Sequence, residues 1–191
     1  MKSSRPPSVR SSVLLVPCVV ILLAACGGGG SSEPQPAPPT AAAADATCGL
    51  PDFSASALAR VNQVRATGAT CGARGTFSPA APVTLNARLT QAAAGHAQDM
   101  ATNNYFSHTS LDGRTFSQRI DATGYQWTNV GENIAAGQAT VNSVIDAWVA
   151  SPDHCANMMN PVYTEIGLAC VPAGSSNTYR TYWAMELGKP A

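Results

Sequence analysis

The sequence predicts an α+β fold, in which helices pack on a small antiparallel sheet. Several segments carry apolar residues at three- and four-residue spacing, which is typical of helices. Two short apolar and aromatic stretches near the C-terminus are typical of strands. The chain has 191 residues, 45% of them hydrophobic and only 12% charged, so it has room for one folded domain rather than several.

Four segments are predicted to be helices because apolar residues recur on one side of each, at residues 54–65, 86–103, 114–123 and 139–149. Asn86 is a residue type favoured at helix N-termini, and the run that follows it is rich in Ala, the best helix former. Gly124 is expected to end the third helix and Pro152 the fourth.

The last part of the chain predicts two strands. Residues 165–171 are short and apolar, and residues 178–188 contain Tyr179, Tyr182 and Trp183. The segment between them, residues 172–177, is rich in turn-forming residues. Two such strands can pair antiparallel, and the helices can then cover them.

The N-terminus predicts export. Lys2, Arg5 and Arg10 precede an apolar run, residues 13–23, that is shorter than a membrane-spanning helix. The run closes with Leu-Ala-Ala-Cys, which resembles the bacterial lipobox, so residues 1–25 are predicted to be a lipoprotein signal peptide and Cys26 the lipidated residue. A plain secretory signal, with an incidental Cys26, is the alternative.

Residues 26–47 are rich in Gly, Ser, Pro and Ala and are predicted to be a tether, because they cannot bury a core. The folded domain is therefore expected at residues 48–191. After the signal peptide the chain holds 8 Lys and Arg against 11 Asp and Glu, so no basic surface for nucleic acid is expected. The partner expected from the N-terminus is a membrane, reached through lipidated Cys26.

Four cysteines remain in the predicted domain: Cys48, Cys71, Cys155 and Cys170. An even number in an exported protein indicates two disulfides, and four cysteines allow three pairings. The simplest pairing is local, Cys48–Cys71 and Cys155–Cys170. A zinc site is the rival interpretation, but the spacing of two residues between cysteines that is common in such sites is missing.

The chain has three histidines. His96 lies inside a predicted helix, where we expect it on the exposed polar face. His108, His154 and Glu132 fall in predicted loops. Two imidazoles and one carboxylate can bind a divalent metal with an open position, or they can form a hydrogen-bonded cluster that holds loops together.

Seven motifs between residues 85 and 188 occur in the order and spacing of a known family. They are Tyr105-Phe106-Ser107-His108, Asp112-Gly113-Arg114, Gly131-Glu132-Asn133-Ile134-Ala135, Trp148 with Ser151-Pro152 and His154, Asn160-Pro161, Ile166-Gly167 and Tyr182-Trp183. This segment resembles a bacterial CAP domain, named for cysteine-rich secretory proteins, antigen 5 and pathogenesis-related 1. The resemblance implies an α-β-α sandwich with a three-stranded antiparallel sheet between helical layers, and an exported protein.

The resemblance also implies a cleft with two His and two Glu. His108, Glu132 and His154 match three of these positions, and they are the metal ligands it implies, for zinc or another divalent metal. The second Glu follows a Trp by three positions in the family, but Trp148 is followed at that distance by Ser151. Asp112, Asp153 or Glu165, or water, could take the fourth place.

Three functions are compatible with these features. The first is a cell-envelope module, monomeric and without a required cofactor, that binds a lipid, glycan or protein ligand in the cleft. The second is a metal-dependent hydrolase of peptides or cell-wall material, with Glu132 as its base. The third is a structural envelope protein with a vestigial cleft. Gly27 after the lipidated Cys26 favours the outer membrane as the destination.

Overall fold

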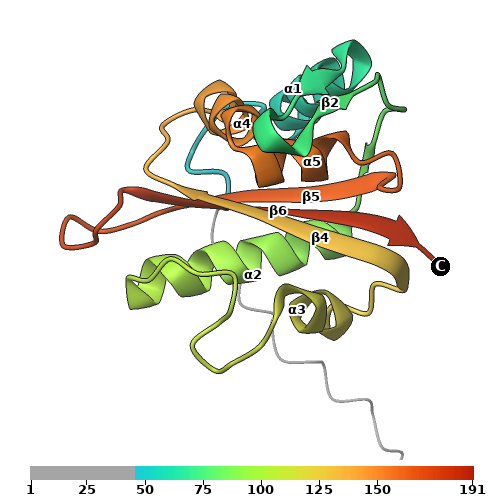
Figure 1. Ribbon diagram of the computed structural model, residues 1–191. Coiled ribbons are helices and arrows are strands. Elements are labelled where there is room, and N and C mark those ends of the chain that lie inside the picture. The colour runs from blue at the N-terminus through green and yellow to red at the C-terminus, as the bar shows by residue number, and fades with distance from the viewer. Residues whose placement is uncertain (1–45) are drawn as a thin grey trace, which may run out of the picture. The chain divides into compact units, whose positions relative to one another are not determined.

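The computed structural model describes residues 46–191. They form a sheet with helices on both faces: α1, α4 and α5 cover one face, and α2 and α3 cover the other (Figure 1). This is the layered α+β arrangement that the sequence and the family resemblance predict. The predicted signal peptide, the predicted lipidation site Cys26 and nearly all of the predicted tether lie outside the described residues.

The four predicted helices are all present, as α1 Phe53–Thr67, α2 Ala87–Asn103, α3 Phe116–Ala122 and α4 Val141–Ala150. The Asn86 side chain caps α2 as predicted, accepting hydrogen bonds from the backbone N–H groups of Arg88 and Leu89. A fifth helix, α5 Pro152–Met159, was not predicted. Pro152 begins it, because proline lacks only an N–H that the first turn leaves unpaired in any case. None of the described helices combines the length and hydropathy that a membrane span requires.

The main sheet has the strand order β3-β5-β6-β4. Its three long strands, β4 Trp127–Ala136, β5 Glu165–Pro172 and β6 Thr181–Pro190, pair antiparallel, and the short β3 Thr84–Leu85 pairs parallel to β5. A separate hairpin of β1 Ala69–Thr70 and β2 Thr76–Phe77 encloses the 3-10 turn η1 Gly72–Arg74. β4 was not predicted as a strand, because its second half is buried on both faces and shows no alternation.

The two faces of the sheet have different cores. Trp148, Met158 and Trp183 belong to the large apolar core under α1, α4 and α5. The core under α2 is built mainly from alanines, so that helix lies close to the sheet. A Cβ added at Gly167 of β5 would stand 2.0 Å from the backbone nitrogen of Thr90, so this approach requires glycine.

The predicted local disulfide pairing is wrong. Cys48 pairs with Cys170 and Cys71 pairs with Cys155, across 122 and 84 residues. The topology explains this outcome, because residues 47–48 run beside β5, where the Cys48 N–H donates to the Cys170 carbonyl at 3.0 Å. The β1–β2 hairpin likewise brings Cys71 against α5.

Candidate functional site

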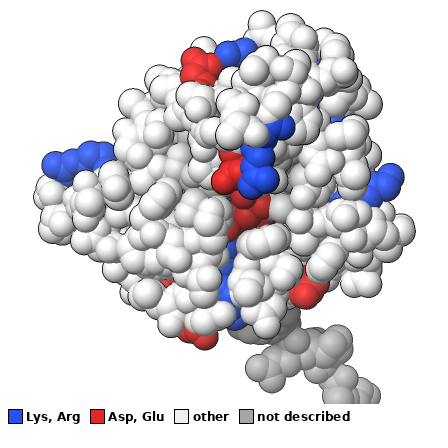
Figure 2. All heavy atoms as spheres, viewed as in Figure 1, with Lys and Arg blue, Asp and Glu red and all other residues white. Residues whose placement is uncertain are grey.

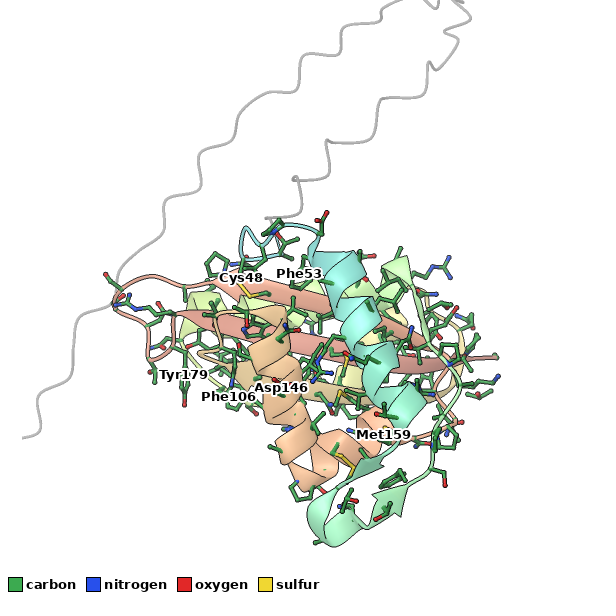
Figure 3. The ribbon with its side chains drawn as sticks, turned by 90° about the horizontal axis from the view of Figure 1, so that it is seen from above. Cys48, Phe53, Phe106, Asp146, Met159 and Tyr179 are labelled. Carbon is green, nitrogen blue, oxygen red and sulfur yellow. A yellow bond between two sulfur atoms is a disulfide. The ribbon has the colours of Figure 1, made fainter. Side chains whose placement is uncertain are left out.

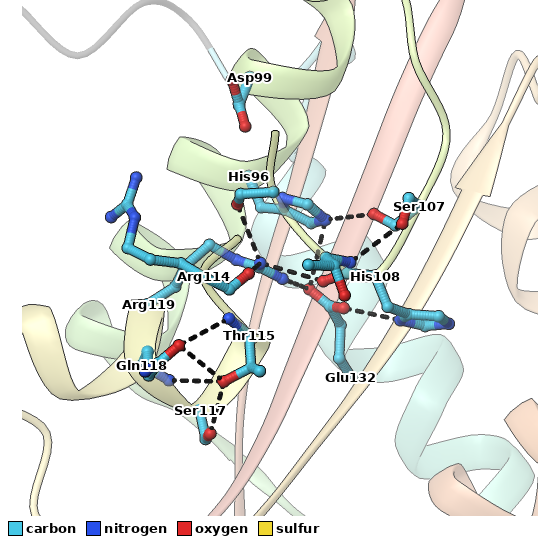
Figure 4. Close-up of polar contacts among 12 residues, drawn as sticks. His96, Asp99, Ser107, His108, Arg114, Thr115, Ser117, Gln118, Arg119 and Glu132 are labelled. Atoms are coloured by element: carbon cyan, nitrogen blue, oxygen red, sulfur yellow. Dashed lines mark hydrogen bonds and ion pairs between the residues drawn. The ribbon is translucent and has the colours of Figure 1, made fainter. Parts of the chain in front are cut away.

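Glu132 is a residue of β4 and lies at the centre of a buried polar cluster (Figure 4). Its side chain is fully buried. Oε1 accepts a hydrogen bond from His108 Nδ1 at 2.7 Å, and Oε2 accepts one from Arg119 Nη2 at 2.5 Å. Burial alone raises the pKa of Glu132, but the His108 hydrogen bond and the Arg119 charge outweigh it, and the pKa falls below its ordinary value. Glu132 is therefore a carboxylate at neutral pH.

Arg119 of α3 fixes the loop that carries His108. Its Nη1 donates to the carbonyls of His108 and Arg114 and to Ser110 Oγ, at 3.0, 3.1 and 3.1 Å. No sequence motif predicted a role for Arg119. One arginine thus holds both the carboxylate and the backbone of its imidazole partner, which orients the His108 ring.

His96 is fully buried beside this cluster, so the prediction of an exposed polar-face residue is wrong. Its Nε2 donates to the Ser107 carbonyl at 2.9 Å and lies 3.8 Å from Glu132 Oε2. Burial, more than the opposing charge of Glu132, lowers the pKa of His96, so the ring is neutral. A histidine that has a carbonyl partner can be buried without a charge.

Glu186 of β6 stands directly opposite Glu132 in the strand register. It is fully buried, and among residues 46–191 neither of its carboxyl oxygens has a donor in hydrogen-bond geometry. Burial first, and then the charge of Glu132, raises the pKa of Glu186 well above its ordinary value. A lone carboxylate inside an apolar strand was the signal in the sequence. Glu132, Arg119, His96 and Glu186 are called the Glu132 cluster below.

His154 lies on α5, not in the loop that was expected. Its ring centroid is 6.4 Å from that of His108, so the structure brings His108, Glu132 and His154 together. Asn133 Nδ2 donates to the His154 carbonyl at 3.0 Å and so joins α5 to β4. Burial and then the charge of His108 lower the pKa of His154, while 51% of the His108 side chain is exposed.

The four candidates for the fourth cleft position lie in different surroundings. The three carboxylates are engaged elsewhere: Asp112 pairs with Arg114 at 2.7 Å, Asp153 with Arg74 at 2.5 Å, and Glu165 accepts from Tyr125 Oη at 2.6 Å. Ser151 lines the same cavity as His154.

A cavity of about 300 Å³ opens beside His154. We call it the β4 cavity. It is lined by Phe106, Ile134, Ala135, Ala136, Gln138, Ala147, Trp148, Ser151, His154 and Tyr179. Phe106 and Tyr179 lie next to each other, with ring centroids 6.0 Å apart (Figure 3). They are 46% and 38% exposed, and the lining contains no Asp, Glu, Lys or Arg.

Charged side chains are sparse on the face shown in Figure 2, and acidic and basic ones gather near its middle. Within residues 46–191 no group of three or more His, Cys, Asp or Glu side chains is arranged to hold one metal ion. Glu132 does not fit as a ligand, because its two oxygens already hold His108 and Arg119. The imidazoles of His108 and His154 are left for a metal, and metal binding there stays a prediction.

Parts of the chain are similar in sequence to two curated proteins. The uncharacterized protein YkwD of Bacillus subtilis strain 168 is 36% identical over 94 residues, which are 49% of this chain and 37% of YkwD. The uncharacterized membrane protein YlbC of the same strain is 32% identical over 78 residues, 41% of this chain and 22% of YlbC. The chain therefore spans well under half the length of both relatives.

Solved structures share the fold. An extracellular protein containing a SCP domain from Bacillus anthracis superposes with a TM-score of 0.55 at 21% identity, over 73% of this chain and 44% of that one. An outer surface protein from Borrelia burgdorferi gives a TM-score of 0.53 at 24% identity, over 59% of this chain and 80% of that one. The profile of the CAP family, described as the cysteine-rich secretory protein family, matches residues 58–187. The chain belongs to this CAP family, and the residues of its Glu132 cluster and β4 cavity all lie within the matched segment.

Proposed function

We propose that this chain is an exported cell-envelope protein whose CAP domain binds a ligand or protein partner in the β4 cavity without converting it. The observation that carries the proposal is the cavity itself, whose lining includes two half-exposed aromatic rings and no Asp, Glu, Lys or Arg. Exposed aromatic rings beside a concave surface are more typical of a binding site than of a folded core.

The polar groups nearby favour binding over hydrolysis. All four cysteines in residues 46–191 are in disulfides. Ser107 Oγ accepts from the Thr109 N–H, and among these residues it has no hydrogen bond to an imidazole. The Glu132 carboxylate is held by an arginine, which makes it a weak base toward a bound group. In this proposal the Glu132 cluster fixes the shape of the cavity rim.

Export is supported by three features. The N-terminal segment has the pattern of a signal peptide, and the two disulfides suit an oxidising compartment. Two structures with the same fold are described as an outer surface protein and an extracellular protein. A lipid on Cys26 would hold the chain on a membrane, and mass spectrometry of the mature N-terminus tests this. An unmodified Cys26 at the N-terminus, or a mature chain that begins elsewhere, would contradict it.

Calorimetric titration of the chain with three probes tests the binding function: a neutral capped peptide, chitotriose and palmitate. We expect one class to bind, and the double substitution Phe106→Ala/Tyr179→Ala to weaken it at least about tenfold, since buried aromatic rings dominate binding energy. Leu111→Ala is the matched control, because Leu111 is 67% exposed and does not line the cavity.

Two results would contradict the proposal. The first is no binding of any probe, and the second is equal binding by the double variant and by the Leu111→Ala control. Mass spectrometry of each probe after incubation tests the hydrolase alternative. Cleavage that Glu132→Gln abolishes would favour that alternative over simple binding.

A further inference from the structure

β4 is an edge strand of the main sheet, and side chains cover part of its free edge. The carbonyls of Val130, Glu132 and Ile134 accept hydrogen bonds from three side chains. The donors are Tyr163 Oη at 3.2 Å, Asn157 Nδ2 at 3.3 Å and Trp148 Nε1 at 3.0 Å. These three carbonyls are two residues apart, so they share the edge that faces away from β6.

Ala136 is the next position on that edge. The Gly137 N–H donates to the Thr181 carbonyl at 2.9 Å, so the residue after Ala136 faces the chain of β6. By the alternation of an antiparallel pair, the N–H and C=O of Ala136 both point away from β6. No side chain among residues 46–191 is hydrogen-bonded to them, so the covering of the edge stops at Ile134.

The uncovered position coincides with the β4 cavity, which Ala136 lines. Gln138 lines it too, and its Oε1 atom is buried without a donor among the described residues. A buried acceptor without a partner is uncommon and calls for a bound group or water. The lining thus includes one residue whose backbone N–H and C=O point away from β6, and one whose side-chain oxygen has no donor among residues 46–191. No Asp, Glu, Lys or Arg lines the cavity.

We propose that the β4 cavity holds an uncharged peptide segment in extended conformation, which adds to the edge of the sheet at Ala136. One residue of the peptide exchanges two backbone hydrogen bonds with Ala136, and a further peptide N–H donates to Gln138 Oε1. A peptide side chain packs against Phe106 and Tyr179. The peptide backbone matches this cavity because its donors and acceptors alternate as a strand edge does, and because it is uncharged like the lining.

This inference rests on the proposed binding function and names the class of ligand. The test is titration of the chain with acetyl-Thr-Val-Thr-Val-Thr-amide, followed by NMR signals of the cavity residues and by calorimetry. Ala136→Pro removes the outward N–H but no hydrogen bond to β6, since that N–H faces away from the sheet. We expect it to weaken peptide binding at least about tenfold. Leu111→Ala is again the control, because Leu111 does not line the cavity, and it is expected to bind the peptide like the parent chain.

A second arm keeps the test independent of the folding of Ala136→Pro. Methylating alternate backbone nitrogens of the peptide removes its donors, so the methylated peptide should bind at least about tenfold more weakly to the unaltered chain. Equal binding of both peptides would overturn the inference, as would full binding by a folded Ala136→Pro variant.

The three probes separate the two proposals. Chitotriose or palmitate binding in the cavity, with no binding of the peptide, overturns the peptide inference and leaves the binding function standing. No binding by any of the three overturns both. Peptide binding that shifts only signals remote from Phe106 and Tyr179 also overturns both, because the β4 cavity is then not the site.

Discussion

The two helical layers position the two imidazoles of the site in different ways. His154 lies in the layer of α1, α4 and α5, where an apolar core and the Cys71–Cys155 disulfide hold the helix that carries it. His108 lies on the side of α2 and α3, where the Glu132 cluster holds its loop by hydrogen bonds and charge. The difference teaches that the position of His154 depends on covalent and apolar contacts, whereas the position of His108 depends on the charges of the Glu132 cluster.

The largest effect is expected from removing the Cys71–Cys155 disulfide, which holds the helix that carries His154. Replacing both Cys71 and Cys155 with Ser should lower the free energy of unfolding by about 4–5 kcal/mol, because the disulfide closes a loop across 84 residues. Guanidinium unfolding measures this. NMR signals of His154 should move in the variant while those of buried His96 stay in place. Equal shifts at both rings would show that the two layers are not held separately.

Arg119→Met removes the ion pair with Glu132, which holds the loop of His108. It leaves the Glu132 carboxylate buried without its cation, so we expect a loss of about 3–5 kcal/mol at neutral pH. Arg114→Met is the matched control, because Arg114 pairs with Asp112 in the solvent, where ion pairs contribute little. Unfolding in urea at pH 7 checks both variants. Similar stability of the two would mean that the Arg119 contacts are not what holds this side.

Glu186→Gln sharpens the comparison with a smaller effect of opposite sign. Because the pKa of Glu186 is raised in the folded state, the unfolded chain releases this proton first, and stability falls as the pH rises above the ordinary value. Gln does not titrate, so the variant should melt at a higher temperature than the parent chain at pH 7–8. The difference should shrink toward pH 4.

Glu132→Gln is the counterpart of that substitution. The pKa of Glu132 is lowered, so its stabilising effect is present above the ordinary value and is lost as the pH falls. This variant should melt at a lower temperature than the parent chain at pH 7, and the gap should close in acid. Melting temperatures of Glu186→Gln and Glu132→Gln that both rise, or both fall, relative to the parent chain at pH 7 would contradict the assignment of charge within the pair.

The sequence was informative where local rules decide the structure. Helix spacing predicted four helices, and the Asn86 cap placed the start of α2 correctly. Motif order predicted the CAP fold, which the family match confirms. His108 and Glu132 were expected to be neighbours, and the structure places them in hydrogen-bond contact.

The failures concern properties that distant contacts decide. The disulfide pairing follows from which strands and loops become neighbours, and local spacing carries no such information. The burial of His96 depends on a carbonyl that a loop eleven residues later provides. Glu186 joins the site only through its register with Glu132 across two strands. A short window of sequence shows that Glu186 is a lone carboxylate in an apolar strand, but it shows neither its partner nor the disulfide pairing nor the burial of His96.

Gly167 sets the dielectric environment of the polar side. Because this residue has no side chain, α2 rests directly on β5, and a Cβ there would meet the helix backbone at 2.0 Å. Any larger residue has to lift α2 from the sheet. Water could then reach the space between α2 and β4 and solvate the facing carboxyls, and the pKa of Glu186 would return toward its ordinary value. The raised pKa of Glu186 on β6 thus depends on the absence of a side chain at Gly167 on β5.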